Sequence, residues 1–250
     1  MEKIEIPQKV KNIITKFLEN KAEIYIVGGA CRDLLLGRVV NDWDFTTNLT
    51  PEEMKKLFPK NSFYNNTFGT LSILGKDGEI FEVTTFRTER GYSDNRHPDE
   101  IKWGKTLKED LERRDFTINA IAIGILDDTL SIIDMFEGQK DLKDKLIRTV
   151  GNSDDRFKED ALRLIRAVRI AGQLNFSIEE KTLKSIQKNA SLIQNIAGER
   201  IRDELFKILI SDKPSNGINL LKESGLLYEL IPELFDGINI TQKGHHIDDV

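Results

Sequence analysis

Apolar positions recur with two different periods in the first part of the chain, and they predict alternating helices and strands. Five of them follow helical spacing and predict an amphipathic helix over 7–20: Val10, Ile13, Ile14, Phe17 and Leu18. Short apolar runs then predict strands at 23–27 and 42–47. A short helix at 30–36 is expected between these two strands.

The next stretch predicts one more helix and a hairpin. Thr50, which precedes a proline, has the form of an N-cap, so we expect a helix from there to about residue 58. The β-rich runs at 67–74 and 79–86 are joined by Gly75–Gly78, a strong hairpin signal. From 87 to 105 the pattern lapses. Such a segment is usually either a functional flap or disordered. We favour a mobile loop that covers an active site.

Beyond residue 154 the pattern is helical, with no convincing strand. Five helices are expected there, at 157–171, 178–188, 197–210, 214–223 and 226–230. The change of character places a domain boundary near residue 150.

The composition describes a highly charged protein. The 250 residues exceed one typical domain, 39% are apolar and 32% are charged. The net charge of −5 gives no global sign of nucleic-acid binding, so any basic site must be local. The single cysteine, Cys31, excludes an intrachain disulfide framework and fits a reducing compartment. Because a signal-peptide core and a membrane-spanning run are both absent, we expect a cytoplasmic protein.

The last residues include His245, His246 and Asp249, a combination that could bind a metal. Three such residues at a chain end are more often a fragment of a longer element. The sequence therefore looks truncated within its helical part, and we assign these residues no role.

The stretch from Ile24 to Phe45 combines features of metal and phosphate sites. Asp42 and Asp44 stand two residues apart in a predicted strand, so their carboxylates would project to the same face. Such a pair is unfavourable without a cation, and carboxylate oxygens suit Mg²⁺. The glycine pair 28–29 before a helix would let backbone N–H groups approach a phosphate. A solvated strand edge and a simple turn are the alternatives, but the order of the features favours the metal and phosphate site.

Two further charged groups have two interpretations each. Glu82 shares a face with Thr84 in a predicted strand, where it would solubilise an edge strand or provide a third carboxylate. Arg113, Arg114 and Asp115 lead into an apolar run, where charges need partners. Triphosphate oxygens and ribose hydroxyls are one candidate set of partners, and neighbouring acidic residues are the other.

Charged residues recur at every third position of the helix expected over 157–171: Asp160, Arg163, Arg166 and Arg169. Residues with this spacing lie on one slowly rotating face, so an acid and three arginines would line a groove. The planar fork of arginine suits phosphates and base edges. A solvated face with Asp–Arg pairs is the alternative.

Five motifs in sequence order closely resemble those of the class II CCA-adding enzymes and the bacterial poly(A) polymerases. They are Gly28–Asp33, Asp42–Phe45, Arg113–Ala120, Glu159–Arg163 and Glu199–Leu205. The resemblance covers about residues 20–210, and the motif RRDFTINA is distinctive.

This resemblance implies an α+β fold in three parts. A nucleotidyltransferase head with a mixed sheet and helices would occupy residues 1–150, and an all-α neck residues 151–210. Residues 211–250 would begin a helical body that binds RNA.

The resemblance also implies roles for individual residues. Asp42 and Asp44 would be catalytic and bind Mg²⁺, with Glu82 as a third catalytic carboxylate. The nucleotide would be bound by Gly29, Arg32, Arg114, Asp160, Arg163, Arg166 and Arg169. In such enzymes the neck helix reads the base, which would fall here to Asp160 and Arg163.

The implied activity is untemplated nucleotide transfer to RNA. The 3′-hydroxyl at the tRNA 3′ end would attack the α-phosphate of CTP or ATP and expel pyrophosphate, with two metal ions at the site. A carboxylate beside a guanidinium is complementary to cytosine and adenine and mismatched with uracil and guanine. A bacterial poly(A) polymerase and an inactive RNA-binding homologue are the alternatives. The segment 84–100 resembles the flexible loop of CCA- or A-adding enzymes, which favours addition of CCA, or part of it, over the poly(A) polymerase.

Overall fold

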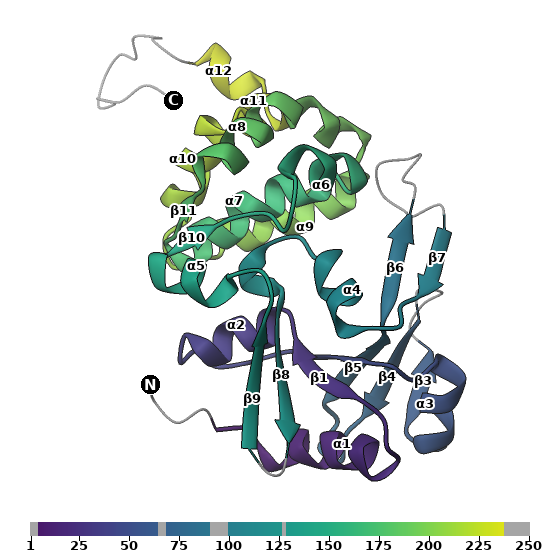
Figure 1. Ribbon diagram of the computed structural model, residues 1–250. Helices are drawn as coiled ribbons and strands as arrows, with labels where there is room; N and C mark the ends of the chain where they lie inside the picture. Colours follow the sequence, from purple (N-terminus) through teal and green to yellow (C-terminus); the bar gives the residue numbers. More distant parts are fainter. Residues whose placement is uncertain (1–4, 65–68, 91–99, 127–128, 238–250) are drawn as a thin grey trace. The chain divides into compact units, whose positions relative to one another are not determined.

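The chain divides into two compact units, one comprising the described residues up to Asp144 and the other those from Lys145 onward. The computed structural model describes residues 5–64, 69–90, 100–126 and 129–237 (Figure 1). The chain-end residues His245, His246 and Asp249 lie outside this description. In the described part of the chain, no helix is long and apolar enough to cross a membrane.

A mixed sheet forms the centre of the first unit. Among the described residues it has seven strands, in the order β3-β4-β5-β2-β1-β8-β9 (Figure 1). β2 and β5 are parallel neighbours, and the other neighbouring pairs are antiparallel. The strands are β1 Ile24–Val27, β2 Trp43–Thr47, β3 Ser62–Tyr64, β4 Thr70–Leu74, β5 Ile80–Thr85, β8 Ile121–Leu126 and β9 Thr129–Asp134. The α+β class with a mixed sheet is therefore confirmed.

The helices of the first unit largely follow the predicted pattern. They are α1 Gln8–Glu19, α2 Gly29–Leu35, α3 Pro51–Leu57, α4 Leu107–Glu112, the 3₁₀ helix η1 Thr117–Asn119 and α5 Gly138–Asp144. α1 packs against β1 and buries four of its five predicted apolar residues, whereas Leu18 is 41% exposed. Thr50 caps α3 in a capping box, because its hydroxyl accepts the N–H of Glu53 while the Glu53 carboxylate accepts the N–H of Thr50.

Alternation along the central strands separates an apolar face of the sheet from a polar one. Ile26, Phe45 and Val83 are neighbours in register, and all three are buried. Successive residues of a strand point to opposite faces, so Asp44 and Glu82 lie on the other face. The local pattern thus places these two carboxylates away from the apolar side of the sheet.

The sequence pattern does not predict the hairpin of β8 and β9. Ile121, Ala122 and Ile123 are all buried, because β8 pairs with β1 on one side and with β9 on the other. A short continuous apolar run cannot be told from a buried helix by its period. Long-range pairing decides its structure.

The prediction of an irregular segment at 87–105 is wrong at its two ends. These ends pair as β6 Arg87–Arg90 and β7 Glu100–Trp103, an antiparallel ribbon in which Arg87 faces Trp103. The partners are remote in sequence and rich in charge, so local alternation does not reveal them. Residues 91–99 lie outside the described residues, and the mobile loop stays a prediction.

The second unit is mainly helical. Its helices are α6 Ser153–Glu159, α7 Leu162–Leu174, α8 Glu180–Asn189, the 3₁₀ helix η2 Ala190–Asn195, α9 Gly198–Leu209, α10 Pro214–Glu223, α11 Leu226–Leu230 and α12 Glu233–Asp236. α7 packs against both α9 and α10. Gly172 permits the close approach of α10, because a Cβ added there would lie 3.1 Å from Cα of Gly217.

One carboxylate links α6 to α8. Asp154 accepts hydrogen bonds from Ser185, from Lys188 and, at 3.0 Å, from Asn189. The bond from Lys188 is the largest of the contributions that lower the pKa of Asp154, to about 2.

The prediction of one continuous helix over 157–171 is wrong. α6 ends at Glu159 and α7 begins at Leu162, and between them Asp160 has an extended backbone with φ −140° and ψ 104°. The carboxylate of Asp160 accepts the N–H of Leu162 at 3.1 Å. Aspartate competes for backbone N–H groups in this way, which favours a helix start over a helix interior.

The prediction that no strand follows residue 154 is wrong for one short pair. β11 Ser177–Ile178 lies parallel to β10 Leu146–Ile147. Asn175 ends α7 in the left-handed conformation, with φ 55° and ψ 48°, and the chain then enters β11. Asparagine tolerates that conformation better than most residues, but two-residue strands carry no periodic signal.

Candidate functional site

The polar face of the sheet brings two carboxylates side by side. Asp44 pairs in register with Val27 of β1 and with Glu82 of the parallel strand β5. Both carboxylate residues are half-buried, and neighbouring strands lie about 4.8 Å apart. Like charges opposite one another are unfavourable. The position therefore suits a cation.

Asp42 lies just outside β2, which begins at Trp43, so the strand predicted from residue 42 is one residue too long. Asp42 is exposed and lines a hollow of about 570 Å³ together with Arg38 and Trp43. Trp43 and Phe45 are buried, whereas Asp44 between them is on the polar face. The opposite orientation of acid and aromatic side chains is thus confirmed within β2.

The donor chemistry of the aspartate pair fits Mg²⁺, which proteins usually hold with one or two carboxylates plus water and substrate phosphates. Across the residues that the structure describes, no group of three His, Cys, Asp or Glu side chains gathers closely enough to hold a metal. Asp42, Asp44 and Glu82 therefore do not form a three-ligand cluster here. Asp42 and Asp44 remain the residues whose oxygens could hold the ion.

Gly28 joins β1 to α2 close to two of the predicted site residues. Its φ of 69° lies in the left-handed region, which glycine adopts without steric cost. A Cβ at Gly28 would lie 3.3 Å from Nη1 of Arg114 and 3.6 Å from Oδ2 of Asp44. At Gly29, a Cβ would lie 3.4 Å from Nη2 of Arg32. Because glycine has no side chain, the main chain here lies next to two guanidiniums and one carboxylate.

A buried acid of α4 binds the two arginines of the RRD motif. Oδ1 of Asp110 accepts from Nη2 of Arg113 at 2.7 Å, and Oδ2 accepts from Nη2 of Arg114 at 3.0 Å. Burial by itself would raise the pKa of Asp110, but the two guanidiniums outweigh it and lower that pKa to about 2. The neighbouring-acid interpretation is therefore confirmed, and contact of Arg114 with a nucleotide stays a prediction.

A second polar network connects the first glycine-containing motif with the RRD motif. Arg32 donates through Nε and Nη2 to the two oxygens of Asp33, at 3.0 and 2.9 Å. Its Nη1 donates to Oδ1 of Asn119 at 3.1 Å. Nδ2 of Asn119 in turn donates to Oδ1 of Asp115 at 3.0 Å. Two segments that are far apart in sequence thus share one hydrogen-bonded chain.

Cys31 lies beneath this region as a packing residue. Its Sγ donates to the carbonyl of Ile26 at 2.9 Å, and the side chain is buried. Burial raises the pKa of the Cys31 thiol, so the thiol stays neutral.

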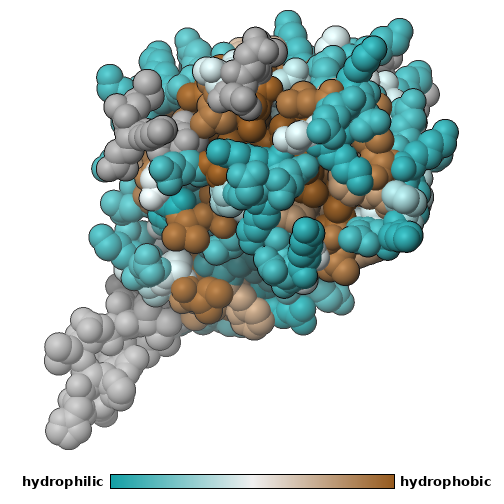
Figure 2. Space-filling view, turned by 90° about the horizontal axis from the view of Figure 1, so that it is seen from below, coloured by the Kyte–Doolittle hydropathy of each residue, from teal (hydrophilic) through white to brown (hydrophobic). Residues whose placement is uncertain are grey.

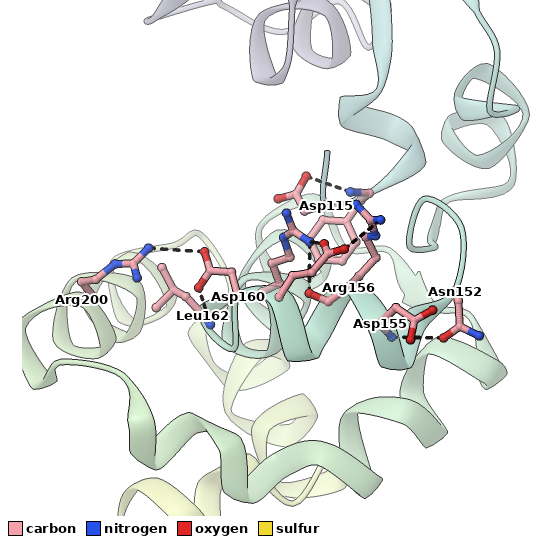
Figure 3. Close-up of polar contacts among 10 residues, drawn as sticks. Asp115, Asn152, Asp155, Arg156, Asp160, Leu162 and Arg200 are labelled. Atoms are coloured by element: carbon pink, nitrogen blue, oxygen red, sulfur yellow. Dashed lines mark hydrogen bonds and ion pairs between the residues drawn. The ribbon is translucent and has the colours of Figure 1, made fainter. Parts of the chain in front are cut away.

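In the second unit, Asp160 organises the start of α7 (Figure 3). Beyond its bond to the N–H of Leu162, its Oδ2 faces Nη2 of Arg200 at 3.5 Å. Arg200 belongs to α9, so Asp160 joins two helices of this unit. Asp160 is therefore held in place from both sides.

Arg163 is turned toward α6 and is almost entirely buried, with 8% of the residue exposed. Its Nη1 donates to Oε2 of Glu159 at 2.6 Å and to the carbonyl of Arg156 at 3.1 Å. A solvated helix face is thus excluded for Arg163.

Arg169 contacts a different helix. Its Nε donates to Oε2 of Glu204 at 2.5 Å, and its Nη1 donates to Gln173 at 2.9 Å. Arg166 is half-buried. Because Asp160 lies outside α7, the prediction that all four residues share one helix face is wrong, whereas Arg163, Arg166 and Arg169 do recur at every third position of α7. Their binding of a nucleotide stays a prediction.

The sequence alone did not single out three residues that organise these sites: Asp110, Asn119 and Arg200. Asp110 precedes Arg113 and Arg114 by three and four positions, a spacing that brings side chains together on a helix. Asn119 and Arg200 stand inside the quoted motifs, but Arg32 and Asp160, which they contact, are remote in sequence. No local signal identifies those partners.

Comparison with protein families matches two parts of the chain. Residues 24–148 match the family described as "Poly A polymerase head domain". Residues 175–237 match the family described as "Probable RNA and SrmB- binding site of polymerase A".

Among known proteins, a CCA-adding enzyme of Lactococcus lactis subsp. lactis (strain IL1403) is 44% identical over 91% of this chain. The match spans 57% of that enzyme's length, so the chain covers little more than half of the relative. A crystal structure of Bacillus stearothermophilus CCA-adding enzyme in complex with CTP is 40% identical, with a TM-score of 0.78 over 88% of this chain and 52% of that one. A Thermotoga maritima CCA-adding enzyme complexed with tRNA_CCA is 28% identical, with a TM-score of 0.76 over 94% of this chain and 58% of that one.

Proposed function

The chain belongs to the family of the class II CCA-adding enzymes and bacterial poly(A) polymerases, and on that premise we propose that it is a tRNA nucleotidyltransferase. It adds C and/or A residues to the tRNA 3′ end from CTP and ATP, without a nucleic-acid template. The observation that carries this proposal is the approach of Asp44, Arg114 and the Gly28 main chain to one point on the polar face of the sheet.

The reaction is an in-line displacement at phosphorus. The terminal 3′-hydroxyl of the RNA attacks the α-phosphate of the nucleoside triphosphate, a new phosphodiester bond forms, and the bond to pyrophosphate breaks. Asp42 and Asp44 would hold Mg²⁺, which when bound stabilises the charge on the attacking and leaving oxygens. Glu82 adds negative charge beside Asp44, which strengthens the attraction for cations at this point of the sheet.

The remaining site residues of the first unit bind the nucleotide. Arg32 and Arg114 have planar guanidiniums that match phosphate oxygens, and Gly29 leaves room for a close approach. Arg114 keeps 17% of its side chain exposed and Arg32 keeps 16%, so both can reach a ligand while their acid partners orient them.

The second unit carries base selection. Asp160 and Arg163 would supply an acceptor and donors that match the edges of cytosine and adenine, and Arg166 and Arg169 of the same unit would also bind the nucleotide. Each mispaired polar group costs about 1–3 kcal/mol when it is buried, which is enough to reject UTP and GTP.

We further propose the three-part division into a head at 1–150, a neck at 151–210 and the beginning of an RNA-binding body at 211–250. The family matches to 24–148 and 175–237 support this division. A cytoplasmic location fits the single, buried and neutral cysteine.

A single incubation series tests the activity. The protein is given Mg²⁺, labelled CTP or ATP, and tRNAs that end before CCA, after C or after CC. Incorporation that stops after the missing residues supports the tRNA enzyme. Long A tails on unrelated RNA would instead favour a poly(A) polymerase, the activity that the name of the matched head domain suggests.

Replacement of the aspartates tests the reaction centre. Asp44→Ala and Asp42→Ala should each lower incorporation by about a thousandfold or more, since a metal supplies several kcal/mol of transition-state stabilisation. Far-UV circular dichroism should stay unchanged, because Asp42 is exposed and Asp44 is on the polar face. Near-normal turnover by both variants would contradict the metal assignment.

A further inference from the structure

We infer that Asn119 is a positioning residue that aims the Arg32 guanidinium at the nucleotide. The inference rests on the proposed function, in which Arg32 binds the incoming nucleoside triphosphate. Nothing in the motif pattern assigns this task to Asn119.

The amide of Asn119 is the central link of a directional chain. Its oxygen accepts from Nη1 of Arg32 at 3.1 Å, and its nitrogen donates to Oδ1 of Asp115 at 3.0 Å. An asparagine offers one acceptor and one donor group, and here each faces the charge that suits it. A rotation of the amide by half a turn would place donor against donor and acceptor against acceptor.

Asp115, at the other end of this series of hydrogen bonds, is itself held in place. Oδ1 of Asp115 also accepts the backbone N–H of Phe116 at 2.8 Å. Asp115 and Asn119 are 8% and 6% exposed, so water competes little for these bonds. The amide of Asn119 is thus a rigid support and not a surface contact.

Arg32 needs such a support because its acid partner, Asp33, is its neighbour in sequence. Asp33 is the next residue of the short helix α2 and occupies Nε and Nη2 of Arg32. The bond to Asn119 ties the guanidinium to a different segment of the unit. Among the described residues, Asp33 and Asn119 engage three of the five N–H groups, and we assign the other two to phosphate oxygens.

The test is a double-mutant cycle on the 250-residue chain, with equilibrium binding of labelled ATP in the presence of Mg²⁺ as the readout. Asn119→Ala should weaken ATP binding about tenfold. In the Arg32→Ala background the same replacement should change binding less than twofold, because Asn119 then has no guanidinium to aim. A merely structural role would give the same loss in both backgrounds and would overturn the inference.

Two controls separate the possible outcomes. Asn48→Ala is the control replacement. The Asn48 side chain accepts a hydrogen bond from the N–H of Glu23 at 2.9 Å, outside the network of Arg32. ATP binding by Asn48→Ala should equal that of the wild type. If Asn119→Ala fails to fold by tryptophan fluorescence, the cycle is run with Asn119→Ser. Wild-type protein that binds no ATP would overturn the proposed function and the inference together. ATP binding that Asn119 replacement leaves unchanged would overturn the inference alone.

Discussion

At the residue scale, one aspartate of the second unit, Asp160, has several protein partners. Asp160 accepts the first N–H of α7 and faces Arg200, while Arg163 is bound to Glu159. The residues proposed to read a base are therefore positioned by protein groups, and their contact with a base can be tested separately from their contribution to folding.

Asp160→Ala should relax nucleotide choice. Loss of the carboxylate removes an acceptor that matches the amino groups of cytosine and adenine, so the preference for CTP and ATP over UTP and GTP should fall by about tenfold or more. Asp160→Asn should shift the nucleotide preference further toward UTP, because its amide can donate to the carbonyl of uracil. The ratio of initial rates with the four nucleotides measures both effects.

A matched control exists on α9. Asp203 is 57% exposed in its side chain and pairs with Arg202, so Asp203→Ala should leave the nucleotide ratio unchanged. Unaltered rejection of UTP by both Asp160 variants would contradict base reading by this residue.

At the element scale, α4 stabilises the RRD segment through one buried carboxylate. Asp110 lies on α4 with 0% of its side chain exposed, and it binds the guanidiniums of both Arg113 and Arg114. Because Arg114 also approaches Gly28, α4 helps to hold a residue of the proposed reaction centre although it contributes no proposed site residue itself.

Acid should weaken this attachment. The pKa of Asp110 in the folded protein, about 2, is below its ordinary value of 3.8. A lowered pKa contributes stability that is complete above the ordinary value and is lost as the pH falls through about 2. The contribution amounts to roughly 2 kcal/mol. Urea unfolding of the wild type and of Asp110→Asn at pH 5 and pH 2 should show a difference that shrinks toward acid.

Asp154→Asn is the corresponding control in the second unit, since the pKa of Asp154 is also lowered to about 2. The stability that Asp154→Asn loses should be seen in the unfolding signal of the second unit. A difference between wild type and Asp110→Asn that stays constant with pH would contradict the ion-pair explanation.

At the scale of the whole molecule, two units have separate cores. Ile14 of α1 is 1% exposed in the first unit, and Ile165 of α7 is fully buried in the second. Replacing either with alanine should lower the free energy of unfolding of its own unit by about 2–5 kcal/mol.

The two tryptophans, Trp43 and Trp103, both belong to the first unit, so tryptophan fluorescence reports on that unit alone. In urea, Ile14→Ala should shift the fluorescence midpoint, whereas Ile165→Ala should shift only part of the circular dichroism transition at 222 nm. Equal shifts of both signals by both variants would mean that the units unfold as one.

The surface at this scale gives little guidance to a partner. The face seen in Figure 2 is mixed, with groups of hydrophobic residues between hydrophilic ones. This agrees with a chain that is 32% charged and carries a net charge of −5.

Much of the local structure follows from the sequence by itself. The spacing of apolar residues predicts α1 and the central strands, and the capping chemistry of Thr50 predicts α3. The alternation in β2 places Asp44 opposite its aromatic neighbours. These features depend on interactions within a few residues, so a single segment contains all the information that they need.

The tertiary structure alone decided the partners. Pairing with β1 made a strand of the apolar run at β8, and the parallel register of β2 with β5 put Glu82 beside Asp44. Asn119 met Arg32 across 87 positions. Arg163 pairs with Glu159 of α6, and Arg169 pairs with Glu204 of α9. Hydrogen bonds between remote segments depend on the tertiary fold, and the spacing of residues within one segment does not reveal it.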